Sequence, residues 1–297
     1  MPMLNTTIRW TLMALALAPL YAADCCRNSV AVVASLSGSA TVRSPARPAK
    51  AAISSLDWLS EGMTLEVGPG SQAVLILVNG HRYQLAAGAQ MTLTANGVPK
   101  LAGAARELPP LPPIPSPAAI VAESAPTSGA VRVRGDAEVS DLYPRAGIVV
   151  LPDNVTLRFK AFPKAGSYRV TLENDGADNL LNVTTETTGI SVPAGTLEAG
   201  AHYRWRVQAL RAGTPIAVGR AEFDALSAEN VLQRMEFASA LGDQNRDAST
   251  LALLAQVDLR LGLVAEACDE LSEALKQKPG DAALQRALDS ARVQLAK

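Results

Sequence analysis

The sequence has few histidines, cysteines and aromatic residues, and no excess of charge of either sign. Its 297 residues include 2 His and 3 Cys, 4% are aromatic, and 27 basic side chains stand against 28 acidic ones, for a net charge of -1. Structural zinc needs about four Cys or His ligands at close spacing, which excludes a zinc ribbon or finger. Nucleic-acid binding relies on a basic excess that releases counterions, so we expect no nucleic-acid partner.

A long hydrophobic run is also missing, although the first 22 residues have the pattern of a secretory signal peptide. Arg9 precedes the apolar run 10–18, Pro19 breaks the run, and Ala22 is a small residue at the expected cleavage position. The run is about ten residues long, whereas a membrane-spanning helix needs about 20. We therefore expect residues 1–22 to be removed and the exported protein to have no transmembrane span.

The three cysteines leave several alternatives open. Cys25 and Cys26 follow the apolar run, but Asp24 precedes them where a lipoprotein signal has a small uncharged residue, which argues against a lipid anchor. In an oxidising compartment, one of this pair could bridge to Cys268, or the adjacent pair could bridge to itself. Alternatively, Cys268 is a small buried hydrophobic residue on a helix.

Residues 29–105 read as a series of short β-strands separated by glycine-containing turns. Asn79-Gly80 lies between two such strands and is a strong signal for a tight hairpin turn in which both central residues have positive φ. The series from Leu59 to Leu93, with Gly62-Met-Thr-Leu, Gly68-Pro-Gly-Ser, Asn79-Gly80, Tyr83-x-Leu85 and Gly88-Ala-Gln-Met-Thr-Leu, resembles the FecR-type β domain of bacterial envelope proteins. The resemblance implies a small all-β module in a periplasmic protein. FecR proteins signal through a membrane helix to a sigma-factor regulator, and this chain lacks those parts.

Residues 106–126 are rich in proline, with seven prolines between Leu108 and Pro126. Proline fixes φ and lacks an N–H donor, so we expect a semi-rigid polyproline II linker between two domains. A ligand for a proline-recognition groove would have the same composition.

Residues 127–225 alternate between apolar and polar side chains, as half-buried strands of a β-sandwich do. One face would carry Leu157, Phe159, Ala161, Tyr168, Val170, Leu172, Tyr203, Trp205, Val207 and Ala209. The segment from Leu197 to Ala209 resembles the tyrosine-corner strand of fibronectin type III domains, and Phe159 stands where that family often has a core tryptophan. The resemblance implies an immunoglobulin-like or fibronectin-like sandwich without a disulfide.

Residues 227–297 have helical periodicity. Small residues at Ala255, Gly262, Ala267 and Ala274 would let two helices approach closely. The spacing of Ala267, Leu271, Ala274 and Pro279 resembles the second helix of a tetratricopeptide repeat, although Asp258 replaces the family's tyrosine. Such a repeat cannot bury its faces alone, so it must pack on the sandwich, on itself or on a partner.

No catalytic motif for a serine hydrolase, a phosphate-binding loop or a zinc protease is present, and we expect neither an enzyme nor a cofactor. We interpret His81 and His202 as surface residues, and Asp269, Glu270 and Glu273 as one solvated helix face.

Four arginines form the candidate binding site. If the fibronectin-like strand order holds, Arg169, Arg204, Arg206 and Arg220 lie on neighbouring strands and point away from the core. Guanidinium groups pair well with carboxylates and phosphates, so this face is a candidate anion or partner site. The alternative is that Glu173 and Glu222 neutralise the arginines through ordinary cross-strand pairs.

Together these patterns predict a multidomain, mainly β protein with a FecR-like β module, a Pro-rich linker, a β-sandwich and a C-terminal α-helical repeat. The expected function is non-enzymatic association with a protein partner in the periplasm, accessory to envelope signalling or surface assembly. Two alternatives are a peptidoglycan- or polysaccharide-binding module and a FecR-type signalling component that acts with a membrane partner.

Overall fold

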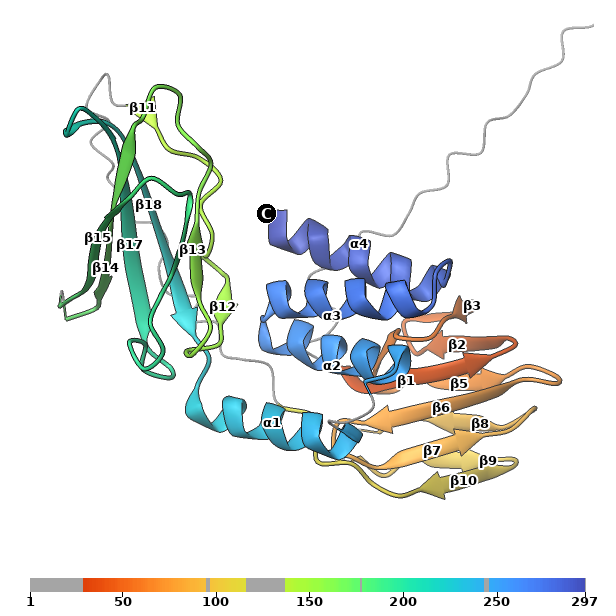
Figure 1. Cartoon of the computed structure of the whole chain (residues 1–297). Coiled ribbons are helices and arrows are strands. Elements are labelled where there is room, and N and C mark those ends of the chain that lie inside the picture. Colours follow the sequence, from red (N-terminus) through yellow and green to blue (C-terminus); the bar gives the residue numbers. More distant parts are fainter. Residues whose placement is uncertain (1–28, 95–96, 116–136, 177, 243–245, 297) are drawn as a thin grey trace, which may run out of the picture.

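A computed structural model describes residues 29–94, 97–115, 137–176, 178–242 and 246–296. The expected signal peptide, Cys25, Cys26 and the whole segment 116–136 lie outside these residues. The fold is mainly β with a C-terminal segment of four helices, as the sequence predicts. In Figure 1 helices α2, α3 and α4 lie between the N-terminal strands and the later strands, and α1 runs below them.

The N-terminal strands form two five-stranded sheets around a shared core. The first sheet has the order β10-β7-β6-β1-β4 and the second the order β3-β2-β5-β8-β9. Their bounds are β1 Ser29–Ser37, β2 Ala40–Ser44, β3 Arg47–Ile53, β4 Trp58–Ser60, β5 Thr64–Val67, β6 Gln72–Leu77, β7 Arg82–Leu85, β8 Gln90–Thr92, β9 Lys100–Ala102 and β10 Ala105–Leu108. Alternate side chains of both sheets, such as Val33, Leu65, Leu75 and Met91, are buried between them.

The Asn79-Gly80 hairpin joins β6 and β7, as predicted, but its turn differs from the predicted type. Gly80 has φ +87°, and among the described residues Asn79 is not one of the non-glycine residues with positive φ. The Gly80 N–H donates to Leu77 O at 2.9 Å. A Cβ on Gly80 would lie 2.1 Å from the Leu111 carbonyl oxygen, so this turn requires glycine for two reasons.

The described part of the proline-rich segment is bound to the N-terminal module. The N–H of Leu111 donates to Gly80 O at 3.0 Å, and the N–H of Ile114 donates to Val78 O at 2.8 Å. Ile114 is buried. Up to Pro115, therefore, the segment packs on a folded surface and does not act as a free spacer, because its non-proline residues still donate hydrogen bonds.

The second β unit is a sandwich. One sheet has the order β11-β18-β17-β14-β15, with β12 also paired to β18, and β13 pairs with β16 in the other. The bounds are β11 Ala137–Glu138, β12 Val149–Val150, β13 Thr156–Arg158, β14 Ser167–Asn174, β15 Asn179–Thr185, β16 Gly189–Ser191, β17 His202–Arg211 and β18 Thr214–Ala225. The residues predicted to face inward are buried, apart from Ala161, which is exposed beyond the end of β13.

Two aromatic side chains of β17 form hydrogen bonds with the backbone of neighbouring loops. The N–H of Glu198 donates to Tyr203 Oη at 2.6 Å, which is the hydrogen bond expected of a tyrosine corner. The indole Nε1 of Trp205 donates to Pro144 O at 2.8 Å. Each polar group is satisfied while the ring remains in the core.

The helices are α1 Ala228–Gly242, α2 Ala248–Leu261, α3 Val264–Gln277 and α4 Ala282–Ala296. Ala255, Ala267 and Ala274 are fully buried, so small residues do line the contacts among α2, α3 and α4. Gly262 ends α2 in the left-handed conformation, φ 81°, and an added Cβ would lie 3.0 Å from Val149 of the sandwich.

One hydrophobic cluster joins both β units to the helices. It contains Val32, Ile76, Ile114, Val149, Leu226, Phe237, Val257, Leu261 and Leu263, and we call it the junction core. Hydrogen bonds also connect the helices to the N-terminal module. Arg260 of α2 donates to Pro115 O at 3.0 Å and to Ser29 O at 3.1 Å. Trp58 of β4 donates to Gln256 of α2 at 2.9 Å. The helical segment thus packs on both β units.

In the described part of the chain, no helix combines the length and the apolar character needed to cross a membrane.

Candidate functional site

The four predicted arginines lie on adjacent strands of the larger sandwich sheet. Arg169 is on β14, Arg204 and Arg206 are on β17, and Arg220 is on β18; all four are exposed. The neighbours of Arg169, Arg204 and Arg206 along their strands are buried, and those of Arg220 are buried or half-buried, so all four project from the outer face. The structure therefore brings the four positions onto one face.

Three of these arginines have no carboxylate directly opposite them in the register, although Glu222 is diagonal to Arg206 and lies two residues from Arg220 on the same face. Arg206 lies directly opposite Arg220, and Arg206 faces Thr171 on its other side. Arg169 faces Gln208, so it is diagonal to Arg206. Within the described residues no ion pair involves Arg169, Arg206 or Arg220. We call these three residues the arginine face.

Arg204 has a different environment. It lies opposite Glu173 on one side and Glu222 on the other, and its guanidinium is 3.7 Å from Asp175 Oδ1. The alternative of ordinary pairing with acidic neighbours thus applies directly to Arg204, whereas Glu173 and Glu222 are only diagonal neighbours of Arg206. Arg204 belongs instead to the lining of a pocket.

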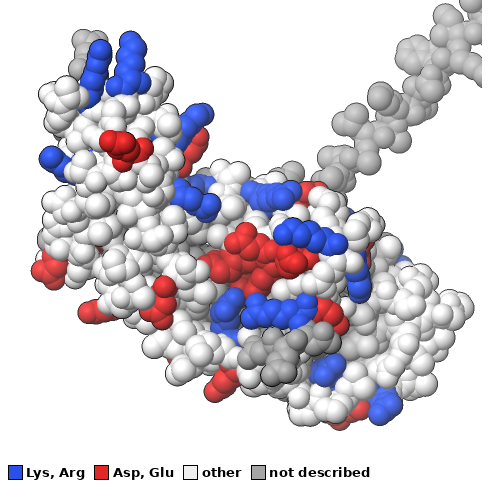
Figure 2. All heavy atoms as spheres, viewed as in Figure 1, with Lys and Arg blue, Asp and Glu red and all other residues white. Residues whose placement is uncertain are grey.

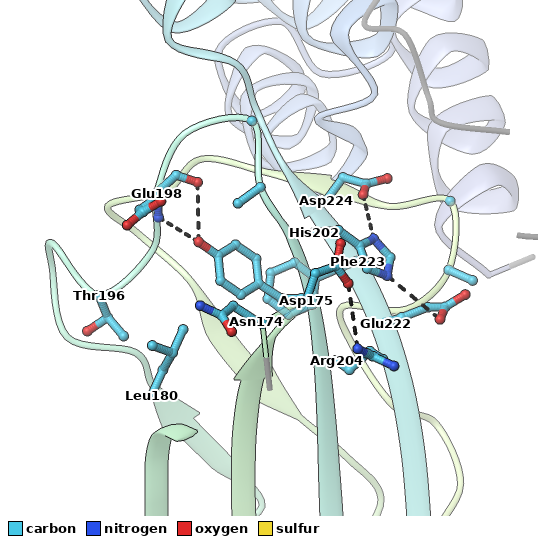
Figure 3. Close-up of a pocket in the computed structure, with 16 residues that line it drawn as sticks. Asn174, Asp175, Leu180, Thr196, Glu198, His202, Arg204, Glu222, Phe223 and Asp224 are labelled. Atoms are coloured by element: carbon cyan, nitrogen blue, oxygen red, sulfur yellow. Dashed lines mark hydrogen bonds and ion pairs between the residues drawn. The ribbon is translucent and has the colours of Figure 1, made fainter. Parts of the chain in front are cut away.

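That pocket is a cavity of about 750 Å³ at the end of the sandwich where β17 begins and β18 ends. Figure 3 shows His202 in its lining, between Asp224 and Glu222 of β18. His202 Nδ1 is 2.7 Å from Asp224 Oδ1, and Nε2 is 3.8 Å from Glu222 Oε2. The described lining also includes Asn174, Asp175, Thr196, Glu198 and Arg204. The pocket is therefore lined with groups that both donate and accept hydrogen bonds.

Tyr203 fixes one wall of the pocket. Its ring stacks on Phe223 with centroids 5.5 Å apart, and its hydroxyl bonds to the backbone of Glu198. Desolvation raises the pKa of Tyr203, while its hydrogen bond with the Glu198 backbone lowers it. The phenol stays neutral and structural.

The interpretation of His202 as a surface residue is wrong. Its side chain is half-buried between two carboxylates. Sequence reasoning missed this arrangement because Glu222 and Asp224 follow His202 by about twenty residues and meet it only through the register of β17 with β18. The alternating pattern of β18 indicated which way Glu222 and Asp224 point, but it could not predict the register of β18 with β17. His81 does lie at the surface, and its Nδ1 is 2.6 Å from Glu107 Oε1.

A second charged cluster lies among the helices, and the sequence analysis missed it. Arg234 of α1 donates to both carboxylate oxygens of Asp258 on α2, each at 2.6 Å, and to Glu270 of α3 at 3.3 Å. Asp258 is fully buried and Glu270 is 9% exposed, so Glu270 does not belong to a solvated helix face as predicted. Figure 2 shows acidic side chains gathered over α3, with basic side chains beside them.

Burial controls protonation in this cluster. Desolvation, with a further contribution from the charge of Asp258, raises the pKa of Glu270 to about 9. Desolvation also raises the pKa of Glu266 to about 7. Glu266 Oε2 and Glu270 Oε2 are buried without a hydrogen-bond partner among the described residues. Burial thus outweighs the nearby arginine charges and favours the protonated form of Glu270.

Of the three cysteines named in the sequence analysis, only Cys268 lies in the described part of the chain. Cys268 is a buried free thiol on α3, and burial raises its pKa. The proposed pairing of Cys25 with Cys26 lies outside the described residues. Among the residues that the structure describes, no group of His, Cys, Asp and Glu side chains has the arrangement of a metal site.

Comparison with protein-family models finds no match, and a search of curated proteins also finds none. Similar solved structures include CopC from Methylosinus trichosporium OB3b, 18% identical, covering 31% of this chain and 94% of that chain, with a TM-score of 0.24. An Fn3-like protein from Clostridium thermocellum is 21% identical over the same shares, with a TM-score of 0.24. FN3tt is 15% identical, covering 26% of this chain and 85% of that chain, with a TM-score of 0.21. These values assign the chain to no family.

Proposed function

We propose that this protein is an exported, non-enzymatic binding protein of the bacterial periplasm whose arginine face docks an acidic protein partner. The observation that carries this proposal is the pair Arg206–Arg220. Two arginines face each other on adjacent strands, and no carboxylate lies directly opposite either of them in the register.

Such a pair has a cost in the isolated protein. Side chains directly opposite each other have Cβ atoms about 5 Å apart, and like charges there are destabilising. Local arrangements that reduce stability without evident compensation are expected at functional sites. A carboxylate-bearing partner would remove the repulsion, because each planar guanidinium can form two parallel hydrogen bonds with a carboxylate.

The architecture supports a binding role. We propose that the three modules are a FecR-like N-terminal module, a fibronectin type III-like sandwich and a helical segment related to tetratricopeptide repeats. The junction core packs this segment on both β units. In this arrangement the helices act as an internal brace, and the outer sheet of the sandwich is the surface presented to a partner.

The test is affinity capture from periplasmic extract, followed by mass spectrometry. The bait variant R206E/R220E reverses the two central charges, and K160E/K164E makes the same charge change at two other exposed lysines of the sandwich. Wild type and K160E/K164E should capture the same acidic protein, and R206E/R220E should lose it. Equal capture by all three baits would contradict the proposal.

A second candidate function rests on the polar pocket. Asn174, Asp175, His202, Glu222 and Asp224 supply the donors and acceptors that bind sugar hydroxyls. A peptidoglycan or polysaccharide chain is the corresponding ligand. Co-sedimentation with purified peptidoglycan that is lost in H202A but kept in R206E/R220E would favour this function over a protein partner.

A further inference from the structure

Strand β15 forms one edge of the larger sandwich sheet. Its only strand partner among the described residues is β14, on the opposite side from the free edge. Figure 1 shows β14 and β15 on the side of the sandwich away from the helices. A free edge presents a row of unpaired N–H and C=O groups, which is a template for another strand.

Proteins usually protect such an edge with charged residues, proline or a bulge. In β15 the only irregularity is at its beginning, where the register shifts between the partners of Leu172 and Glu173. The regular remainder, 181–185, reads Leu-Asn-Val-Thr-Thr and contains neither a charge nor a proline. Five consecutive uncharged residues in register with β14 therefore leave this edge unprotected.

The residues of the segment 181–185 suit pairing with the same segment of a second copy. Val183 lies opposite buried Val170 and faces inward, whereas Asn182 and Thr184 are exposed on the outer face. An antiparallel copy centred on Val183 keeps these faces: valine meets valine on the inner face, and Asn182 meets Thr184 on the outer face. Every pair within 181–185 is then uncharged and keeps the inside–outside pattern of the sheet.

The flanking charges fix the register. A two-fold axis at Asn182 would place Asp178 of one copy opposite Glu186 of the other, and both side chains are exposed acids. An axis at Val183 moves those two acids out of register with each other.

We propose that β15 pairs antiparallel with β15 of a second copy of this chain, with the two-fold axis at Val183. The two sandwiches then share one continuous sheet. The contact is small, so the dimer is a weak one that depends on protein concentration. This inference is independent of the arginine face and of any acidic partner.

Sedimentation velocity of the full exported chain up to its highest soluble concentration tests the pairing. Wild type should shift from monomer to dimer as concentration rises. In N182K/T184K each lysine faces a lysine of the second copy, and dimerisation should weaken at least tenfold. In N182K/T184E each lysine faces a glutamate instead, and dimerisation should be retained.

The control T214K/S191K adds the same charge at exposed positions outside β15 and should dimerise like wild type. A wild type that stays monomeric, or an N182K/T184K variant that dimerises equally well, would overturn the inference, and neither result bears on the arginine face.

Cysteine cross-linking tests the register separately. In a C25S/C26S background, V183C should form a disulfide-linked dimer on mild oxidation, because cysteines at a two-fold axis lie within the Cα separation of about 4 to 7 Å that a disulfide requires. N182C is displaced from its own copy by two residues, about 7 Å along the strand, and should not cross-link. Efficient cross-linking of N182C but not V183C would overturn the proposed axis.

Discussion

Arg206 and Arg220, on the sandwich, and Asp258 and Glu270, among the helices, are two like-charge pairs in very different environments. The arginines are exposed, so solvent screens their repulsion and a partner can reach them. The carboxylates are buried, so a proton and Arg234 neutralise them. For this reason we assign a binding role to the first pair and a structural role to the second.

The buried pair makes stability depend on pH. In the folded protein the pKa of Glu270 is about 9, above its ordinary value of 4.5. Between these values the folded state holds a proton that the unfolded state releases. Stability therefore falls as pH rises through this window, by up to about 1.4 kcal/mol per pH unit for one proton.

The variant E270Q should remove much of this dependence, because glutamine mimics the neutral acid and can still accept a hydrogen bond from Arg234. Urea unfolding at several pH values between 5 and 8 measures the slope. Relative to wild type, E270Q should gain stability as pH rises. The exposed neighbour Glu273 provides the control E273Q, whose slope should match wild type. Parallel slopes for E270Q and wild type would show that Glu270 is ionised in the folded state.

At the scale of elements, the turn at Gly80 connects a hairpin to the proline-rich segment. Gly80 and Gly88 both have positive φ, but only Gly80 has a backbone carbonyl in the space of a Cβ. The variant G88A should lose about 1 kcal/mol from backbone strain alone. The variant G80A should lose more, roughly 2 to 4 kcal/mol, because the Leu111 carbonyl must also move.

Thermal unfolding compares the two variants, and hydrogen exchange locates the effect. In G80A the amides of Leu111 and Ile114 should exchange faster, because their acceptors lie at Gly80 and Val78. Equal losses in G80A and G88A, with unchanged exchange at these amides, would mean that the segment 109–115 packs independently of this turn.

The strands and helices were largely predictable because their signals are local. The alternation Tyr203, Trp205 and Val207 predicted the buried face of β17, and the spacing of Ala267, Leu271 and Ala274 predicted the buried face of α3. The strand β3, by contrast, reads Arg-Pro-Ala-Lys-Ala-Ala-Ile and has no period-two pattern. It forms because it pairs with β2, an interaction that the local sequence does not encode.

The candidate site was predictable only in part for the same reason. Strand alternation placed the four arginines on the outer face, but only the register shows that Arg204 has acidic neighbours and that Arg206 faces Arg220. The pocket around His202 likewise depends on long-range pairing. Periodicity reports the direction of a side chain and not its neighbour across the sheet.

At the scale of the whole molecule, the junction core should couple the unfolding of both β units. Phe237 of α1 is 1% exposed in this core, and F237A should cost about 3 to 5 kcal/mol. Trp58 lies in the N-terminal module and Trp205 in the sandwich, so their fluorescence reports the two units separately. The two probes should share one midpoint in wild type and separate in F237A.

The control is M235A on the same helix, because Met235 is 60% exposed and should change stability by less than about 0.5 kcal/mol. Single-tryptophan variants assign each signal to its unit. Two separate midpoints already in wild type would show that the helices do not brace the two units together.

The most direct test of the binding role is an NMR titration that follows the side-chain Nε–H signals of the arginines while an acidic polypeptide, polyglutamate, is added. We predict saturable shifts at Arg169, Arg206 and Arg220 that disappear at high salt, and smaller shifts at Arg204, which has acidic neighbours. Shifts at arginines elsewhere, with none on the arginine face, would contradict an anion-binding role for this surface.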